Sequence, residues 1–108
     1  MNTIFCLVSR QSMANVLPVL MFNPEQVVLF ATPEEKKSAD YLEKLFSNKS
    51  IKVNRIDNLD AYDYHLFKQT VKNEIMKYED RVILNVTGGT KLMALAAYES
   101  FIECSKPI

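Results

Sequence analysis

Apolar and polar residues follow one another along the chain in blocks that predict four strands, each followed by a helix. Three short runs are almost continuously apolar, which is typical of strands covered on both faces. They are 3–9 (TIFCLVS), 26–32 (QVVLFAT) and 81–87 (RVILNVT). A fourth run, 51–57 (IKVNRID), alternates between apolar and polar residues and indicates a strand at the edge of a sheet.

The segments that follow these strands have the residue spacing of amphipathic helices. The pattern predicts helices over 14–22, 33–48, 61–79 and 90–104. Pro18 is expected near the first turn of the first helix, where its missing N–H has little effect. Asp60 is the expected N-cap of the third helix.

Four strand–helix units in succession predict an α/β fold, a Rossmann-like open parallel sheet with helices on both faces. A strand order of 3-2-1-4 would place the first and fourth strands side by side at the topological switch point, where such sheets bind ligands. We expect residues 1–108 to form one domain. Because the sequence stops at SKPI, where a fifth strand would begin, we expect either part of a larger domain or a partner over the open edge of the fourth strand.

Composition and charge restrict the classes of function. The 48% hydrophobic and 24% charged residues are those of an ordinary globular protein. Thirteen basic and thirteen acidic residues cancel, so we expect no long nucleic acid to be bound through a general basic field. No apolar run approaches the roughly 18 residues that span a bilayer, and the first residues do not form a signal peptide. We therefore expect a cytoplasmic protein that does not contact a membrane.

Cysteine and histidine give little support for metal or nucleophilic chemistry. Cys6 and Cys104 are isolated in the sequence and are expected to be buried, reduced thiols. His65 has no partner at metal-ligand spacing and no nearby nucleophile. We therefore predict no metal site and no cofactor.

The only two glycines of the chain, Gly88 and Gly89, stand together between the fourth strand and the last helix. Backbone N–H groups without a Cβ in the way could face a phosphate there, at the positive end of the helix dipole. Thr87, Thr90 and Lys91 would add hydroxyl donors and a cation. In the alternative, Gly88 only turns the chain and Thr90 only caps the helix. The spacing matches neither a Walker A loop nor the G-x-G-x-x-G fingerprint, so NTP hydrolysis and hydride transfer lose their usual support.

A second polar segment follows the first strand, and the order 3-2-1-4 brings it beside the glycine turn. Its polar residues are Ser9, Arg10, Gln11, Ser12 and Asn15. Gln11 and Asn15 could read base or ribose edges while the turn holds phosphate, whereas Ser9 or Ser12 could instead cap the first helix. Thr32 ends the second strand at the same rim, although capping of the helix that begins at Pro33 is its favoured role.

Together these segments resemble the CRISPR-associated Rossmann-fold (CARF) sensor domains. The resemblance lies in SRQSMANVLPVL, FATPEE and VILNVTGGTKLMALAAYE. It follows the whole chain in the order of elements and is most specific over 85–98. The chain is most similar to the CARF–nuclease effectors of type III CRISPR systems, whose sensor carries an N-(V/L)-T-G-G-T-K turn. The last elements of a full CARF domain and the D-x(n)-E-x-K pattern of a PD-(D/E)xK nuclease are absent from the 108 residues.

The resemblance implies a function, a ligand and partners. Such domains form two-fold homodimers that bind a cyclic oligoadenylate, most often cyclic tetra-adenylate, and switch a separate effector nuclease domain, which a longer version of this chain would carry. By position, Ser9–Ser12 and Asn15 match the first ligand-binding loop and Thr87–Lys91 the second, with Asn85 at the start of the same motif.

Two other functions remain open beside that of a sensor. One is a metal-independent ring nuclease, in which a ribose 2′-OH attacks the adjacent phosphorus of the bound ring. Lys91 would then stabilise the developing charge, and Ser9 or Ser12 would orient the ribose. The other is an unrelated nucleotide-binding Rossmann-like domain. We expect a sensor rather than an enzyme.

Overall fold

Four parallel strands form a single sheet in the order β3-β2-β1-β4. The structure is a computed structural model that describes residues 2–11, 13–78 and 81–106. Its strands are β1 (Thr3–Leu7), β2 (Gln26–Phe30), β3 (Lys52–Ile56) and β4 (Val82–Asn85). The predicted fold class and strand order are therefore confirmed, with β1 and β4 as neighbours.

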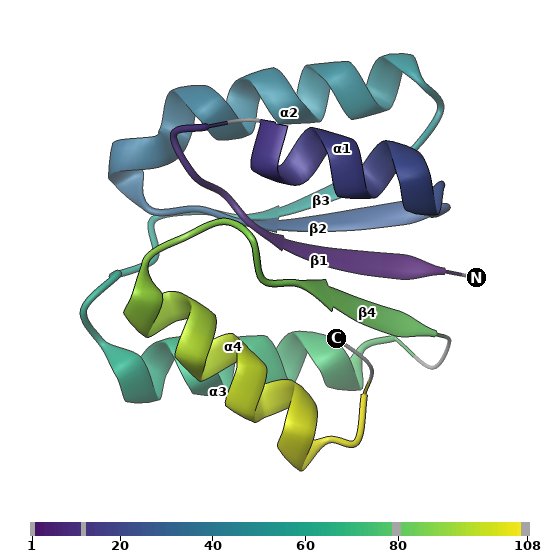
Figure 1. Cartoon of the computed structure of the whole chain (residues 1–108). Helices are drawn as coiled ribbons and strands as arrows, with labels where there is room; N and C mark the ends of the chain where they lie inside the picture. The colour runs from purple at the N-terminus through teal and green to yellow at the C-terminus, as the bar shows by residue number, and fades with distance from the viewer. Residues whose placement is uncertain (1, 12, 79–80, 107–108) are drawn as a thin grey trace.

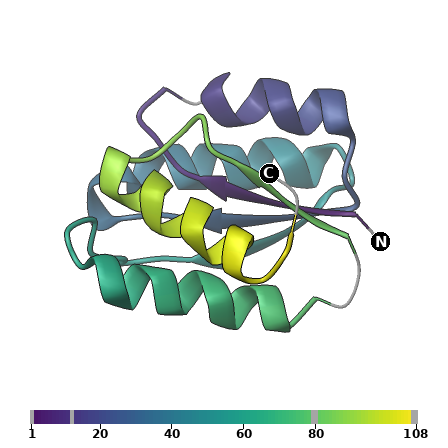
Figure 2. The ribbon, with the colours of Figure 1, turned by 60° about the horizontal axis from the view of Figure 1, so that its bottom comes forward.

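Two helices cover each face of the sheet, as predicted (Figure 1). Helices α1 (Met13–Phe22) and α2 (Lys36–Asn48) lie on one face, and α3 (Tyr64–Met76) and α4 (Lys91–Glu103) lie on the other. A short 3₁₀ turn, η1 (Pro33–Glu35), leads from β2 into α2. Figure 2 shows α3 and α4 side by side on the near face of the sheet. Among the described residues, no helix has both the length and the apolar character needed to cross a membrane.

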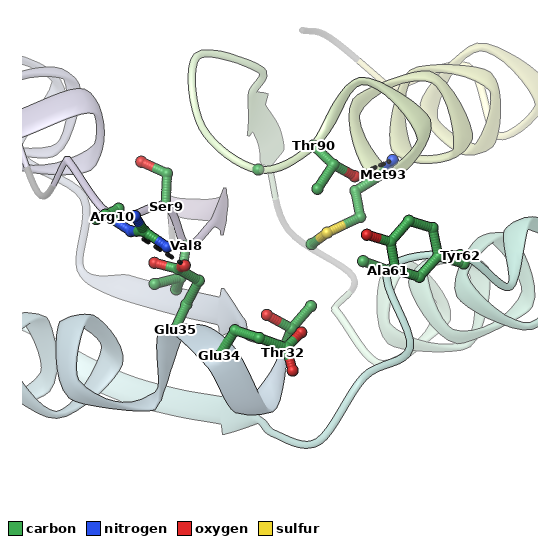
Figure 3. A pocket seen from close by; sticks show the side chains of 11 residues that line it. Val8, Ser9, Arg10, Thr32, Glu34, Glu35, Ala61, Tyr62, Thr90 and Met93 are labelled. Carbon is green, nitrogen blue, oxygen red and sulfur yellow. Dashed lines mark hydrogen bonds and ion pairs between the residues drawn. The ribbon is translucent and has the colours of Figure 1, made fainter.

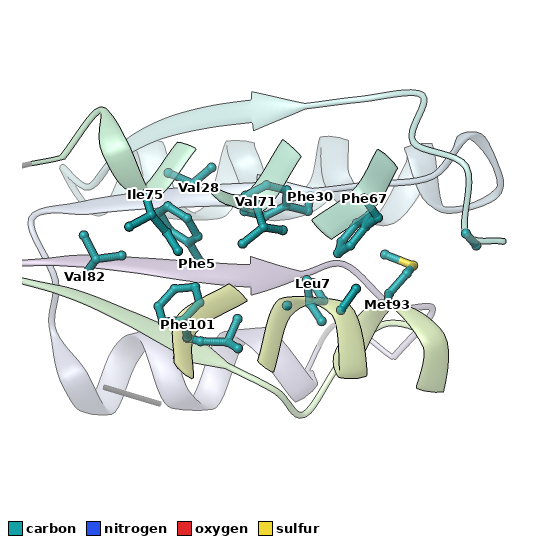
Figure 4. Close-up of a cluster of buried hydrophobic side chains, with 14 residues drawn as sticks. Phe5, Leu7, Val28, Phe30, Phe67, Val71, Ile75, Val82, Met93 and Phe101 are labelled. Carbon is teal, nitrogen blue, oxygen red and sulfur yellow. The ribbon is translucent and has the colours of Figure 1, made fainter. Parts of the chain in front are cut away.

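The central strands are buried throughout because their side chains alternate between two cores. Phe5 and Leu7 of β1 point into the core that α3 and α4 close (Figure 4). Ile4 and Cys6 point into the core on the α1 and α2 face. The Phe5 ring lies 5.4 Å from that of Phe101 in α4, tilted edge-to-face, which fixes α4 against the strand that leads to the rim described below.

The third helix begins later than the sequence predicted. Its N-cap is Asp63, whose Oδ1 accepts a hydrogen bond from the Leu66 N–H at 3.0 Å. Asp60 instead accepts from the Tyr62 N–H at 2.8 Å and closes a turn in the loop before the helix. Either aspartate has the chemistry of a cap, and the path of the loop decides between them. The helix also ends earlier than predicted, at Met76, and the predicted last residue 79 lies outside the described residues.

The two cysteines differ in accessibility, and this leads to a first prediction. Burial in β1 raises the pKa of the Cys6 thiol to about 12, whereas Cys104 at the end of α4 is half-buried. Because the thiolate is the nucleophile, iodoacetamide at pH 8 should label Cys104 in the native protein and Cys6 only after denaturation. Peptide mass spectrometry measures both sites. Labelling of native Cys6 at the same rate as Cys104 would contradict this packing of β1.

Candidate ligand-binding site

The carboxyl ends of β1, β2 and β4 bring three distant segments to one rim of the sheet. They are the β1–α1 loop, the β2–η1 segment and the β4–α4 turn. In Figure 1 the two loops beyond β1 and β4 approach each other at the end of the sheet where the strand arrows point. This is the location at which open α/β sheets bind ligands.

Two buried asparagines join the first loop to the glycine turn. Asn15 in α1 donates from Nδ2 to the carbonyl oxygen of Leu7 at 3.1 Å, and Asn85 at the end of β4 donates to Asn15 Oδ1 at 3.2 Å. Asn15 has no exposed surface and Asn85 is 7% exposed. In this structure, both side chains therefore hold the two segments together rather than face solvent.

A proline frees the acceptor that completes this junction. Pro18 lies inside α1, beyond the first turn in which the sequence placed it. Because it has no N–H, the carbonyl of Ala14 lacks its usual helical donor. Asn85 Nδ2 donates to that carbonyl at 2.9 Å, and the Thr87 hydroxyl lies 2.6 Å from it. Donors from the end of β4 thus satisfy a helix carbonyl in α1.

Each glycine is required by the geometry of the turn itself. A Cβ on Gly88 would lie 2.1 Å from the carbonyl oxygen of Leu7, so only glycine fits against the end of β1. Gly89 has a φ of +79°, and a Cβ there would lie 2.9 Å from the Cβ of Leu7. Thr90 caps α4, since its Oγ1 accepts from the Met93 N–H at 3.1 Å. The structural roles considered for Gly88 and Thr90 are therefore present, and any contact with a phosphate would be additional.

Several predicted residues remain available to a ligand at this rim. Arg10, Gln11 and Lys91 are exposed, and Lys91 is the first residue of α4. The N–H groups at the start of this helix and its dipole favour an anion. The Ser9 hydroxyl donates to the carbonyl of Gln11 at 3.0 Å, which shapes the loop. Ser12 lies outside the described residues.

A cavity of about 250 Å³ opens between the three segments (Figure 3). Five of the predicted site residues line it: Ser9, Arg10, Thr32, Gly89 and Thr90. The preferred role of Thr32 as a helix cap is not realised by its side chain: it occupies the N-cap position of η1 without a side-chain cap hydrogen bond. It is 5% exposed and lines the cavity instead.

Other residues of the cavity did not emerge from the sequence. Glu34 and Glu35 line the cavity. In the sequence they follow Thr32 at the start of a helix, where acidic residues are common because they interact favourably with the helix dipole. Tyr62 and Met93 reach the cavity from the β3–α3 loop and from α4. Their position in the loop that follows β3 and in the first turn of α4 was the available signal, but the direction of their side chains depends on the loop path. Among the described residues, no three His, Cys, Asp or Glu side chains are grouped so that they could hold a metal ion.

A family model described as the Card1 CARF domain matches residues 3–107. The chain belongs to this CARF family. The resemblance drawn from the three sequence motifs is therefore confirmed. A search of curated proteins found no match to this CARF domain.

Two solved structures share the CARF fold. One is Can2 from Sulfobacillus thermosulfidooxidans in complex with cyclic tetra-adenylate, with a TM-score of 0.86 and 31% identity. The match covers 98% of this CARF domain and 30% of that chain. The other is a type III CRISPR defence DNA nuclease activated by cyclic oligoadenylate, with a TM-score of 0.79 and 25% identity, covering 91% of this chain and 16% of that one. The CARF domain thus spans less than a third of the length of either protein.

Proposed function

We propose that this CARF domain binds a cyclic oligoadenylate, with cyclic tetra-adenylate as the preferred ring, and acts as a sensor in type III CRISPR antiviral signalling. The observation that carries the proposal is the match of nearly the whole chain to Can2 in complex with cyclic tetra-adenylate. In a longer version of the chain, the ring would switch an effector nuclease domain.

The rim offers separate chemistry for the parts of a nucleotide ring. Gly89, Thr90 and Lys91 supply backbone donors, a helix N-terminus and an exposed cation for phosphate. Arg10 and Gln11 supply exposed polar side chains from the first loop. The cavity of about 250 Å³ is smaller than the clefts of ~300–1,000 Å³ that enclose drug-sized ligands, so one protomer would hold only part of a tetranucleotide ring.

If each protomer holds half of a two-fold symmetric ring, a second protomer is required. Helix α1 offers a surface for contact with that second protomer. Its outward side carries Met13, Leu17, Leu20 and Met21, which are all exposed apolar side chains. We propose a homodimer in which α1 of each protomer lies in the interface beside the rim.

Light scattering should give a mass twice that of one chain at high micromolar concentration. Leu17→Glu should give a monomer, because a charge would be buried in the interface. Tyr41→Glu on α2, at a similarly exposed position, should remain a dimer. A wild-type protein that is monomeric both with and without cyclic tetra-adenylate would contradict the proposed dimer.

Binding and cleavage can be separated in one experiment. We expect calorimetry in EDTA to show saturable binding of cyclic tetra-adenylate, and mass spectrometry of the recovered ligand to show an intact ring. Linear products would support the ring nuclease, in which Lys91 and Ser9 or Ser12 act on the bound ring. The absence of binding at ligand concentrations up to the millimolar range would contradict the proposed function.

A further inference from the structure

We infer that the cavity at the rim is an adenine-recognition pocket, in which the Glu35 carboxylate accepts a hydrogen bond from the exocyclic amino group of the base and the Thr32 hydroxyl pairs with a ring nitrogen. The inference rests on the proposed function and adds to it the residues that select the base.

Glu35 places a carboxylate, a hydrogen-bond acceptor, at the wall of the cavity. It ends η1, and its side chain is only 17% exposed while lining the cavity. The nearest cation is Arg10, whose Nε lies 4.0 Å from Glu35 Oε1 and whose side chain is 90% exposed. This distance is too long for a hydrogen bond, so the carboxylate keeps its acceptor capacity for a ligand. A carboxylate here repels phosphate and favours a neutral ligand group that donates a hydrogen bond.

Thr32 supplies the matching donor. It precedes η1 and is 5% exposed, and its hydroxyl has no hydrogen-bond partner among the described residues. Figure 3 shows Thr32 and Glu35 on the same side of the cavity. A hydroxyl that lines a cavity without a protein partner is satisfied by a ligand or by water. The pair therefore presents one obligate acceptor and one donor from a single short segment.

The remaining walls suit a flat aromatic ring. Val8, Ala61 and Met93 are buried and form an apolar lining. Tyr62 is almost fully exposed at the opposite side of the cavity from Glu35, as Figure 3 shows, and its ring is available to stack on a base. An apolar slot with two polar groups at one side is the usual arrangement for reading the edge of a base.

The hydrogen-bonding edge of adenine complements these two groups, and that of hypoxanthine does not. Adenine carries an N6 amino donor beside a ring-nitrogen acceptor, which complements a carboxylate beside a hydroxyl. Hypoxanthine, guanine and uracil place a carbonyl oxygen where adenine has its amino group, and that oxygen would face the Glu35 carboxylate. Cytosine has a similar amino edge, but its single ring covers less of the apolar lining.

The test compares cyclic tetra-adenylate with cyclic tetra-inosinate, which replaces only the amino group by a carbonyl. Calorimetry on the intact chain should give the wild type at least about tenfold tighter binding of the adenylate ring, the size of a hydrogen bond to a charged group. Glu35→Gln should bring the two affinities to within about threefold, because a carboxamide can either donate or accept. Thr32→Val should weaken adenylate binding several-fold, whereas Thr32→Ser, which keeps the hydroxyl, should not.

The controls separate recognition of the base from loss of charge and from loss of the fold. Glu25→Gln removes one carboxylate at the opposite end of β2 and should leave the adenylate-to-inosinate ratio unchanged, and thermal melts verify that each variant is folded. A ratio that Glu35→Gln leaves intact, or that Glu34→Gln abolishes instead, would overturn the inference. Equal binding of both rings by the wild type would overturn it while leaving the proposed function in place. Binding of neither ring would contradict the proposed function itself, and the inference with it.

Discussion

A Gly88→Ala variant should be less stable than the wild type by about 3 kcal/mol or more. The added Cβ would lie 2.1 Å from the carbonyl oxygen of Leu7, which is backbone at the end of a central strand. That oxygen also accepts from Asn15 Nδ2, so moving it would break a buried hydrogen bond. For a chain of this length, the loss corresponds to a melting temperature lower by roughly 10–20 °C, measured by calorimetry or circular dichroism.

Gly89→Ala is the matched control for this prediction. Its φ of +79° and a contact of 2.9 Å with the Leu7 side chain should cost about 1–2 kcal/mol, less than the clash with backbone at Gly88. We therefore expect Gly88→Ala to melt at a lower temperature than Gly89→Ala, and both below the wild type. A Gly88→Ala protein with the wild-type melting temperature would show that the turn does not approach β1 as closely as the structure has it.

Lys91→Ala should weaken the binding of cyclic tetra-adenylate by roughly ten- to a hundred-fold without lowering the melting temperature. Loss of a charge-assisted hydrogen bond to phosphate is worth about 1.5–3 kcal/mol. Lys91 is exposed at the start of α4, so removing its side chain leaves the core intact. Calorimetry at fixed salt measures the affinity, and thermal melts measure the stability.

Lys49→Ala provides the comparison for Lys91→Ala. Lys49 is exposed at the end of α2, at the opposite end of the sheet from the rim, and its removal changes the net charge equally. Its variant should bind as the wild type does. Undiminished affinity of Lys91→Ala would exclude this lysine from the phosphate site, and an equal loss in both variants would indicate general electrostatic attraction instead.

The fold could be predicted because its causes are local and periodic. Strands such as β1 are buried at every position and almost wholly apolar, since helices cover both faces, and the regular alternation with helices leaves few parallel topologies. The glycine turn and the first loop could be placed at one rim for the same reason. The N-cap of α3 was predicted at Asp60 but lies at Asp63, because its position depends on the path of a loop.

Whether a site residue binds a ligand or holds the protein together was harder to predict, because it depends on which group its side chain contacts. From the sequence alone, Asn15 and Thr87 read as ligand contacts, and Gly89 as a residue that lets backbone N–H groups face a phosphate. In the structure, Asn15 binds the Leu7 carbonyl, and the positive φ of Gly89 makes any substitution there a change in stability. In the sequence, Glu35 has the position of an ordinary acidic residue at a helix start. Only the structure shows that it lines the cavity.

The bonds to the Ala14 carbonyl also determine when the rim is completed as the chain is synthesised. Asn85 and Thr87 lie 71 and 73 residues beyond Ala14, so the first loop leaves the ribosome long before its donors exist. Until then, only water can satisfy the carbonyl that Pro18 leaves without a helical partner. The rim therefore closes through contacts of high sequence separation, which form late and slowly. A nascent chain that ends before residue 82 would expose the hydrogen-bonding edge of β1 with which β4 pairs, so the step that completes the rim also removes this aggregation hazard.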